Sequence, residues 1–249
     1  MSLSGLTRSR VQRDHALLAP ESHVPCTLPG WHEATLTILI SPRIGAGFTQ
    51  YLVDVQPGGR AAPAQPGIQR FIYVLEGELA ADLGDGPSSI GAGAYIYVPA
   101  DHPLSLSAAA TSRLLVFEKP FVPSGGRAPK AILAHERDII AEAFLGDPTA
   151  MLKTFLPTDA SYDMAINHFT FEPGASLPMV EVHVMEHGLT ILSGEGVYRL
   201  GDSWYPVQKG DSIWMAPYLP QWFCAIGKTT TSYIYYKDMN RDVYAPGQR

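Results

Sequence analysis

The chain has 249 residues, of which 46% are apolar and 17% are charged, and it contains 23 glycines, 21 prolines and a formal net charge of −6. These values exclude a disordered chain and are typical of a turn-rich β protein with a large core. A nucleic-acid partner is not expected, because no basic stripe offsets the acidic balance.

The N-terminal residues contain arginines but lack the apolar segment of a signal peptide. No apolar run of about 18 residues occurs in the chain, so no membrane partner is expected either. The two cysteines, Cys26 and Cys224, are too few for a disulfide framework and indicate a reducing compartment. We therefore expect a cytoplasmic protein.

Short apolar runs rich in Val, Ile, Tyr and Phe, separated by Gly, Pro, Asp and Ser turns, predict the strands of a sandwich or barrel. In chain order we expect an N-terminal arm over 1–30, a first barrel over 31–119, a linker over 120–160 and a second barrel over 161–249. Within the linker, residues 134–144 predict a helix, because Ile139, Ile140 and Phe144 would lie on one side of it. Residues 198–205 predict a hairpin with Gly201 and Asp202 in the turn.

The second barrel repeats the first. Segment 74–78 (VLEGE) resembles segment 191–195 (ILSGE) at an offset of 117 residues, and a further glycine follows each central glycine after 16 residues. Upstream, Pro57-Gly58 corresponds to Pro173-Gly174 at an offset of 116. Three matched points in the same order indicate duplication.

A cluster of potential metal ligands, Glu181, His183 and His187, lies within seven residues. On a strand, Glu181 and His183 would share one face. His187 would lie roughly 13 Å from His183 along a straight strand, too far for one ion, so the chain must bend near residues 184–186. Glu186 falls on this bend, where we expect a solvated charge.

Paired strands around two spaced glycines, with a Pro-Gly turn upstream and metal ligands between them, resemble the cupin fold. Two such units imply an all-β bicupin with two jelly-roll-like barrels and a short helical connector. In the first barrel the ligand positions fall on Ala64, Pro66 and Arg70, or on the residues one further along, and none of these sets can hold a metal. His102 lies near the position of a later ligand, but one histidine rarely holds an ion alone, so we expect the first barrel to be structural or to serve assembly.

In the second barrel, Gln221 falls where the cupin fold places a later ligand, and its amide oxygen completes a mixed N/O set. We therefore expect one Mn²⁺ per chain in the C-terminal barrel rather than tetrahedral Zn²⁺, with Fe²⁺ as an alternative. On the last strand Tyr233, Tyr235 and Lys237 share one face. Alternation alone leaves open whether this face points inward, toward an anion, or outward to solvent.

Residues 164–241 resemble the C-terminal barrel of (S)-ureidoglycine aminohydrolases, the bicupin enzymes of allantoin degradation in purine catabolism. The resemblance rests on EVHVMEHGL at 181–189, GEGVYRL at 194–200, WYPVQ at 204–208, WMAP at 214–217, PQW at 220–222 and YYKD at 235–238. The Glu-x-His-x-x-x-His pattern with glutamine as fourth ligand is more specific than the histidine-rich motif of cupins in general.

The resemblance implies Mn²⁺ ligands at Glu181, His183, His187 and Gln221, and substrate contacts at Tyr198, Tyr233 and Lys237. It implies that water replaces the amine of ureidoglycine to give ureidoglycolate and ammonia. Our mechanistic hypothesis adds two catalytic residues: Glu181 carries a proton, and Lys237, with Tyr233 or Tyr198, holds the substrate carboxylate. Two alternatives are an Fe(II)-dependent bicupin dioxygenase and a non-catalytic metabolite-binding cupin. We also expect a homo-oligomer, since the outer strands are apolar.

Overall fold

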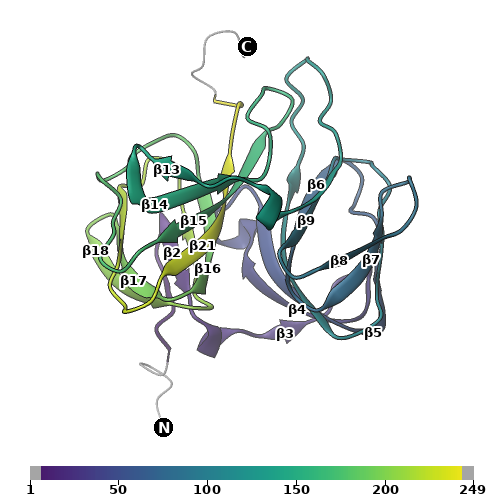
Figure 1. Cartoon of the computed structure of the whole chain (residues 1–249), viewed down its shortest axis with the longest axis horizontal. Coiled ribbons are helices and arrows are strands. Elements are labelled where there is room, and N and C mark those ends of the chain that lie inside the picture. The colour runs from purple at the N-terminus through teal and green to yellow at the C-terminus, as the bar shows by residue number, and fades with distance from the viewer. Residues whose placement is uncertain (1–6, 243–249) are drawn as a thin grey trace. The chain divides into compact units, whose positions relative to one another are not determined.

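The computed structural model describes residues 7–242, and its strands separate into two units (Figure 1). The N-terminal unit comprises residues 24–42 and 47–138, and the C-terminal unit comprises residues 7–23, 43–46 and 139–242. No strand pairing crosses from one unit to the other among the described residues, because each unit has its own sheets. The expected all-β architecture of two repeated strand units is confirmed.

The N-terminal unit is built from one sheet in which β9, β6, β11 and β5 are central neighbours. The β-branched and aromatic composition of these strands favours extended backbone, and the glycines between them supply the turns. Its strands are β3 (Pro25–Cys26), β4 (Trp31–Ile40), β5 (Thr49–Ala61), β6 (Ile68–Glu76), β7 (Glu78–Asp82), β8 (Ser88–Gly91), β9 (Ala94–Val98), β10 (Ser105–Ala108), β11 (Ser112–Pro120) and β12 (Ile132–His135).

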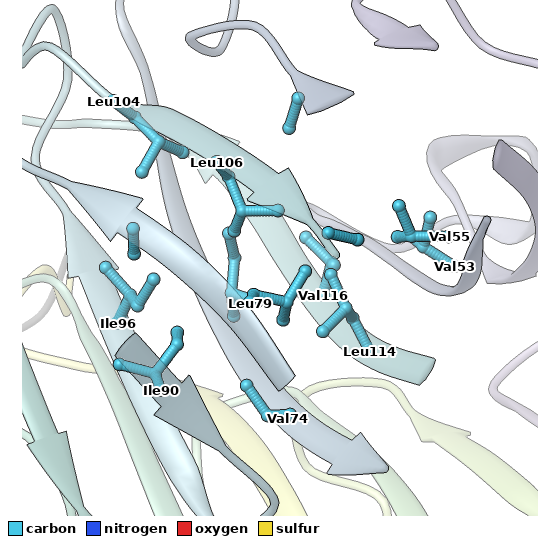
Figure 2. Packing of buried hydrophobic residues seen from close by; sticks show 14 of the residues in the cluster. Val53, Val55, Val74, Leu79, Ile90, Ile96, Leu104, Leu106, Leu114 and Val116 are labelled. Atoms are coloured by element: carbon cyan, nitrogen blue, oxygen red, sulfur yellow. The ribbon is translucent and has the colours of Figure 1, made fainter. Parts of the chain in front are cut away.

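The inner face of this sheet carries a core made mostly of aliphatic side chains. Leu36, Val53, Ile72, Leu114 and Val116 are all fully buried in it. Figure 2 shows valine, leucine and isoleucine side chains from several strands meeting in this cluster. Branched aliphatic side chains of this size interdigitate closely, so the interior of the N-terminal unit is filled by its own core.

The C-terminal unit contains an eight-stranded sheet, in the order β1-β2-β19-β16-β21-β15-β14-β13, and a three-stranded sheet, β18-β17-β20. The N-terminal arm takes part in the larger sheet, because β2 pairs with the edge of β19. The strands are β1 (Arg10–Val11), β2 (His15–Leu18), β13 (Glu142–Phe144), β14 (Asp147–Thr154), β15 (Met164–Phe171), β16 (His187–Ser193), β17 (Glu195–Leu200), β18 (Ser203–Gln208), β19 (Ser212–Met215), β20 (Gln221–Ala225) and β21 (Thr231–Asp238). The predicted hairpin is confirmed as β17–β18, with a turn at Gly201 and Asp202.

The two units repeat one another in detail at the matched glycines. Gly77 and Gly194 both have positive φ, and a Cβ at either position would collide with the hydroxyl-bearing residue of a neighbouring strand, Ser112 or Thr231. Each hydroxyl accepts a hydrogen bond from the backbone amide of the residue that follows the glycine. The Glu78 amide donates to Ser112 Oγ at 3.1 Å, and the Glu195 amide donates to Thr231 Oγ1 at 3.1 Å. The duplication read from the sequence is thus a duplication of structure.

The helix expected over residues 134–144 is wrong. This segment contains the end of β12, a single 3₁₀ turn, η3 (Glu136–Asp138), and β13. β12 extends the sheet beside β9, and β13 pairs with β14, so both ends gain ladder hydrogen bonds that outweigh the helical pattern. Ile140, assigned to the buried side of the helix, is 85% exposed. The other helical elements of the described residues are two more 3₁₀ turns, η1 (Pro20–Ser22) and η2 (Pro42–Ile44). Among these residues no helix is long and apolar enough to cross a membrane.

Candidate active site

A cavity of about 90 Å³ in the C-terminal unit brings together all the site residues predicted from the sequence. Its walls come from β13, β15, β16, β17, β20 and β21 and from the segment between β15 and β16. The lining residues are Glu181, His183, His187, Tyr198, Gln221, Tyr233 and Lys237, as predicted, together with Phe144, Phe169 and Tyr235. Lys237 therefore belongs to an inward face, the orientation that alternation alone left open.

Glu181 and His183 lie in an irregular segment rather than on the expected strand. Only Glu181 is paired: its amide donates to the Gln221 carbonyl at 2.8 Å, and the Gln221 amide donates back at 3.0 Å. The alternation still holds, because Glu181 and His183 line the cavity while Val180 and Val182 are exposed. The expected bend is confirmed between Val184 and the start of β16 at His187.

Hydrogen bonds fix His183 on both ring nitrogens. Nδ1 lies 3.1 Å from the Met185 carbonyl oxygen, and because a carbonyl can only accept, Nδ1 carries the proton. Nε2 is then the acceptor and lies 3.1 Å from Nε2 of Gln221, while Tyr198 Oη donates to Gln221 Oε1 at 3.4 Å. The turn before β20 holds the same histidine from the main chain, since the Tyr218 amide donates to the His183 carbonyl at 2.7 Å. His183 and Gln221 are thereby directed at the same part of the cavity.

Stacking rather than hydrogen bonding orients His187. Its Nε2 is buried and has no hydrogen-bond partner among the described residues. Its ring lies 4.7 Å from the His183 ring and 5.4 Å from the Tyr235 ring, centroid to centroid, with interplanar angles of 23° and 15°. Burial, followed by the nearby His183 and Lys237, lowers the pKa of His187 well below its usual value, so the imidazole is neutral.

Two opposite charges, Glu181 and Lys237, share the cavity. Burial raises the pKa of Glu181, and the positive charge of Lys237 opposes that rise. Burial lowers the pKa of Lys237, against the influence of Glu181 and Asp238. Burial also raises the pKa values of Tyr198 and Tyr233, so both phenols stay protonated as potential donors. The cavity therefore offers one cation and neutral hydroxyl donors to a small anion.

The donor types fit a borderline divalent cation. Two neutral imidazoles, one carboxylate and one amide oxygen suit Mn²⁺, and the buried, unpartnered Nε2 of His187 is a lone pair of the kind that a bound ion satisfies. Among residues 7–242, however, no three His, Cys, Asp or Glu side chains are gathered tightly enough to hold a metal by themselves. The residues thus fit the ion in chemistry, and Gln221 is needed to complete the set.

Glu186 differs from the expected solvated charge. It is only 7% exposed, and its carboxylate accepts a hydrogen bond from Trp214 Nε1 at 3.3 Å. Its backbone amide donates to Asp238 Oδ1 at 2.6 Å, which ties the bend before β16 to the end of β21. Glu186 therefore anchors the bend and does not line the cavity.

In the N-terminal unit, an ion pair stands where the C-terminal unit has cavity residues. Arg70 and Glu118 face one another across β6 and β11, the register position that His187 and Lys237 occupy across β16 and β21. Arg70 Nε lies 2.5 Å from Glu118 Oε1, and the guanidinium packs over Trp31 at 5.5 Å. His102 has its Nδ1 2.9 Å from the Pro103 carbonyl oxygen and lies on an outer loop.

Three lining residues were missed by sequence reasoning. Alternation predicts the correct face for Tyr235 but no role for it, because the sequence does not distinguish a tyrosine that lines a cavity from one that packs in the core. Phe144 lay in the segment expected to be helical, and Phe169 reads as an ordinary strand residue. The alternation of residues 233–237 was the available signal for Tyr235, and no comparable signal marks the two phenylalanines.

The fold and site can be compared with known proteins. The family model described as Cupin domain matches residues 51–117 and 167–235, one match in each unit. Because this domain is matched once in each unit, the chain is a bicupin.

Similar proteins indicate which family of bicupins the chain belongs to. A protein of Oryza sativa subsp. japonica named probable (S)-ureidoglycine aminohydrolase is 43% identical over 243 residues, which covers 96% of this chain and 78% of the rice protein. The (S)-ureidoglycine aminohydrolase of Escherichia coli (strain K12) is 36% identical, with coverage of 92% and 89%. The crystal structure of protein Ylba from E. coli superimposes with a TM-score of 0.85 at 34% identity, covering 96% of this chain and 97% of the other. The chain belongs to the (S)-ureidoglycine aminohydrolase family.

Proposed function

We propose that the chain hydrolyses (S)-ureidoglycine to (S)-ureidoglycolate and ammonia in the breakdown of allantoin, as a Mn²⁺-dependent enzyme. The observation that carries this proposal is the convergence of Glu181, His183, His187, Gln221 and Lys237 on one cavity of a chain in this family. The relatives' names support the reaction, and the donor set supports the metal.

Substrate recognition is assigned to the cation and hydroxyl donors of the cavity. Ureidoglycine has a carboxylate, an amine and a ureido nitrogen on one carbon. Lys237, half-buried beside Tyr233 on the inward face of β21, neutralises the carboxylate, and the protonated phenol of Tyr233 or Tyr198 donates a hydrogen bond to it. Aromatic walls from Phe144 and Phe169 leave little room for a larger substituent.

Glu181, His183, His187 and Gln221 would hold the metal ion, which would act as a Lewis acid at the reacting carbon's substituents. Of the residues described around the cavity, Glu181 alone carries a carboxylate, so we assign it the transfer of a proton at its carboxylate oxygen between water and the departing amine. Fixing the substrate against Lys237 leaves one face of the carbon toward water, which makes the product a single enantiomer.

The test uses freshly generated ureidoglycine and the full chain. We expect ammonia release faster than the spontaneous reaction, with (S)-ureidoglycolate as the single enantiomer on chiral chromatography. A racemic product formed at the spontaneous rate would exclude the proposed activity. Oxygen removal should leave the rate unchanged, since hydrolysis consumes no oxidant.

The remaining expectations concern assembly and location. We propose a homo-oligomer in the cytoplasm. Exposed apolar side chains at Met179, Val182, Trp204 and Tyr218 support association between copies. Sedimentation velocity should give a multiple of the 27.0 kDa chain mass, and a single species of that mass would contradict it.

A further inference from the structure

His183 and His187 are supported in different ways. His183 is hydrogen-bonded through both ring nitrogens, to the Met185 carbonyl and to Gln221. The buried Nε2 of His187 has no hydrogen-bond partner in the described part of the chain, and the ring is flanked instead by His183 and Tyr235 at small interplanar angles. A metal-binding histidine is usually oriented by a hydrogen bond from the ring nitrogen that does not bind the ion. The His187 side chain makes no hydrogen bond in the described part of the chain, so its orientation needs another source.

Tyr235 is held firmly enough to be that source. It is 7% exposed, and its ring stacks on Phe169 with centroids 5.9 Å apart and planes 18° apart. Asn167, the residue directly opposite it on β15, is itself only 3% exposed, so the surroundings of Tyr235 on this strand are buried. Phe169, Tyr235, His187 and His183 thus form a continuous series of nearly parallel rings.

We propose that Tyr235 is a positioning residue whose aromatic ring fixes the plane of the His187 imidazole and so prepares it as a metal ligand. The inference rests on the metal site of the proposed function. It adds a residue that contacts a metal-binding histidine and not the ion itself. Because the ring performs the task, phenylalanine should replace tyrosine, and an aliphatic side chain should not. The stack on Phe169 serves to hold the ring.

The test compares Tyr235→Phe and Tyr235→Leu in the full chain, with Phe171→Leu as the matched control. Phe171 is fully buried in the same core and packs on Phe169, Phe223 and Tyr233, so its loss loosens the core without removing a ring from His187. Each protein is freed of metal with a chelator and titrated with MnCl₂ by calorimetry, and its thermal midpoint is recorded.

We expect Tyr235→Leu to bind Mn²⁺ about 10- to 100-fold more weakly than the unmodified chain, the usual cost of losing a residue that orients a ligand. Tyr235→Phe should stay within about threefold, and Phe171→Leu should lose stability without losing affinity. Unchanged affinity in Tyr235→Leu, or equal weakening in Phe171→Leu, would overturn the role of the ring.

A metal-free readout separates this inference from the proposed function. If the unmodified chain fails to bind Mn²⁺, the metal assignment itself fails. The crystal structure of metal-free Tyr235→Leu then still reports on the ring: a rotated or disordered His187 side chain supports positioning, and an unchanged one contradicts it.

Discussion

At the scale of single residues, the site depends on a segment that leaves the sheet for a few residues. Glu181 is anchored to Gln221 by two backbone hydrogen bonds, and Glu186 is anchored to Trp214 and Asp238. Between these anchors the chain bends, so the centroids of the His183 and His187 rings lie 4.7 Å apart. The shared face of Glu181 and His183 and the bend before His187 could be predicted from spacing. The anchoring role of Glu186 could not, because its partners lie 28 and 52 residues away.

The role of Glu181 can be tested by Glu181→Gln, which keeps the size of the side chain but removes its ability to carry a proton. We expect kcat to fall by roughly 100-fold or more, the usual contribution of a positioned general acid or base. Ammonia release from ureidoglycine and metal content should be measured together. Glu186→Gln is the control, since its amide oxygen can still accept from Trp214, and its rate should stay near normal. A Glu181→Gln variant with normal metal and near-normal rate would contradict the assignment.

At the scale of elements, the strands and the duplication could be read from the sequence because period-two alternation and paired glycines are local signals. The linker could not, because Ile139, Ile140 and Phe144 have helical spacing, whereas the structure leaves Ile139 and Ile140 outside any strand and places Phe144 in β13. β13 pairs with β14 and carries Phe144 to the cavity, and β12 pairs with β9. Likewise, β2 in the N-terminal arm pairs with β19, nearly 200 residues away, and no sequence pattern in the arm predicts this pairing.

The arm should contribute to the stability of the C-terminal unit through one ion pair. Arg8 donates to both carboxylate oxygens of Asp211, at 2.6 and 2.7 Å, and Asp211 is fully buried. Because Arg8 remains about one-third exposed, we expect Arg8→Ala to lower the free energy of unfolding by about 1–2 kcal/mol in urea denaturation. Arg10→Ala, which removes hydrogen bonds to the exposed carbonyls of Thr7 and Ser9, should change it by less than about 0.5 kcal/mol. Equal effects of the two substitutions would refute this role of the arm.

At the scale of the whole molecule, the two units share one framework but carry different side chains at a register position that matters for the site. In the C-terminal unit this position holds His187 and Lys237, and in the N-terminal unit it holds Arg70 and Glu118. The Arg70 guanidinium also donates to the Ala62 carbonyl at 2.9 Å and packs on Trp31. An ion pair therefore occupies the position in the N-terminal unit that His187 and Lys237 occupy in the C-terminal unit.

This pair gives a prediction for the N-terminal unit. Arg70→Met leaves Glu118 without its cation in a largely buried position, and we expect it to lower the free energy of unfolding by about 2–3 kcal/mol. The double variant Arg70→Met with Glu118→Met should recover most of that loss, because neither charge is left unpaired. Urea denaturation measures both, and a double variant no more stable than the single one would show that the pair does not act as a unit.

The central claim is that one cavity, in one of two similar units, holds the metal and performs the hydrolysis. The most direct measurement is to titrate Mn²⁺ into the chelator-treated chain while ammonia release from ureidoglycine is followed. We expect only the spontaneous rate before addition, and then a linear rise that saturates at one equivalent of Mn²⁺ per chain. Full activity in the metal-free chain, or saturation at two equivalents, would contradict it.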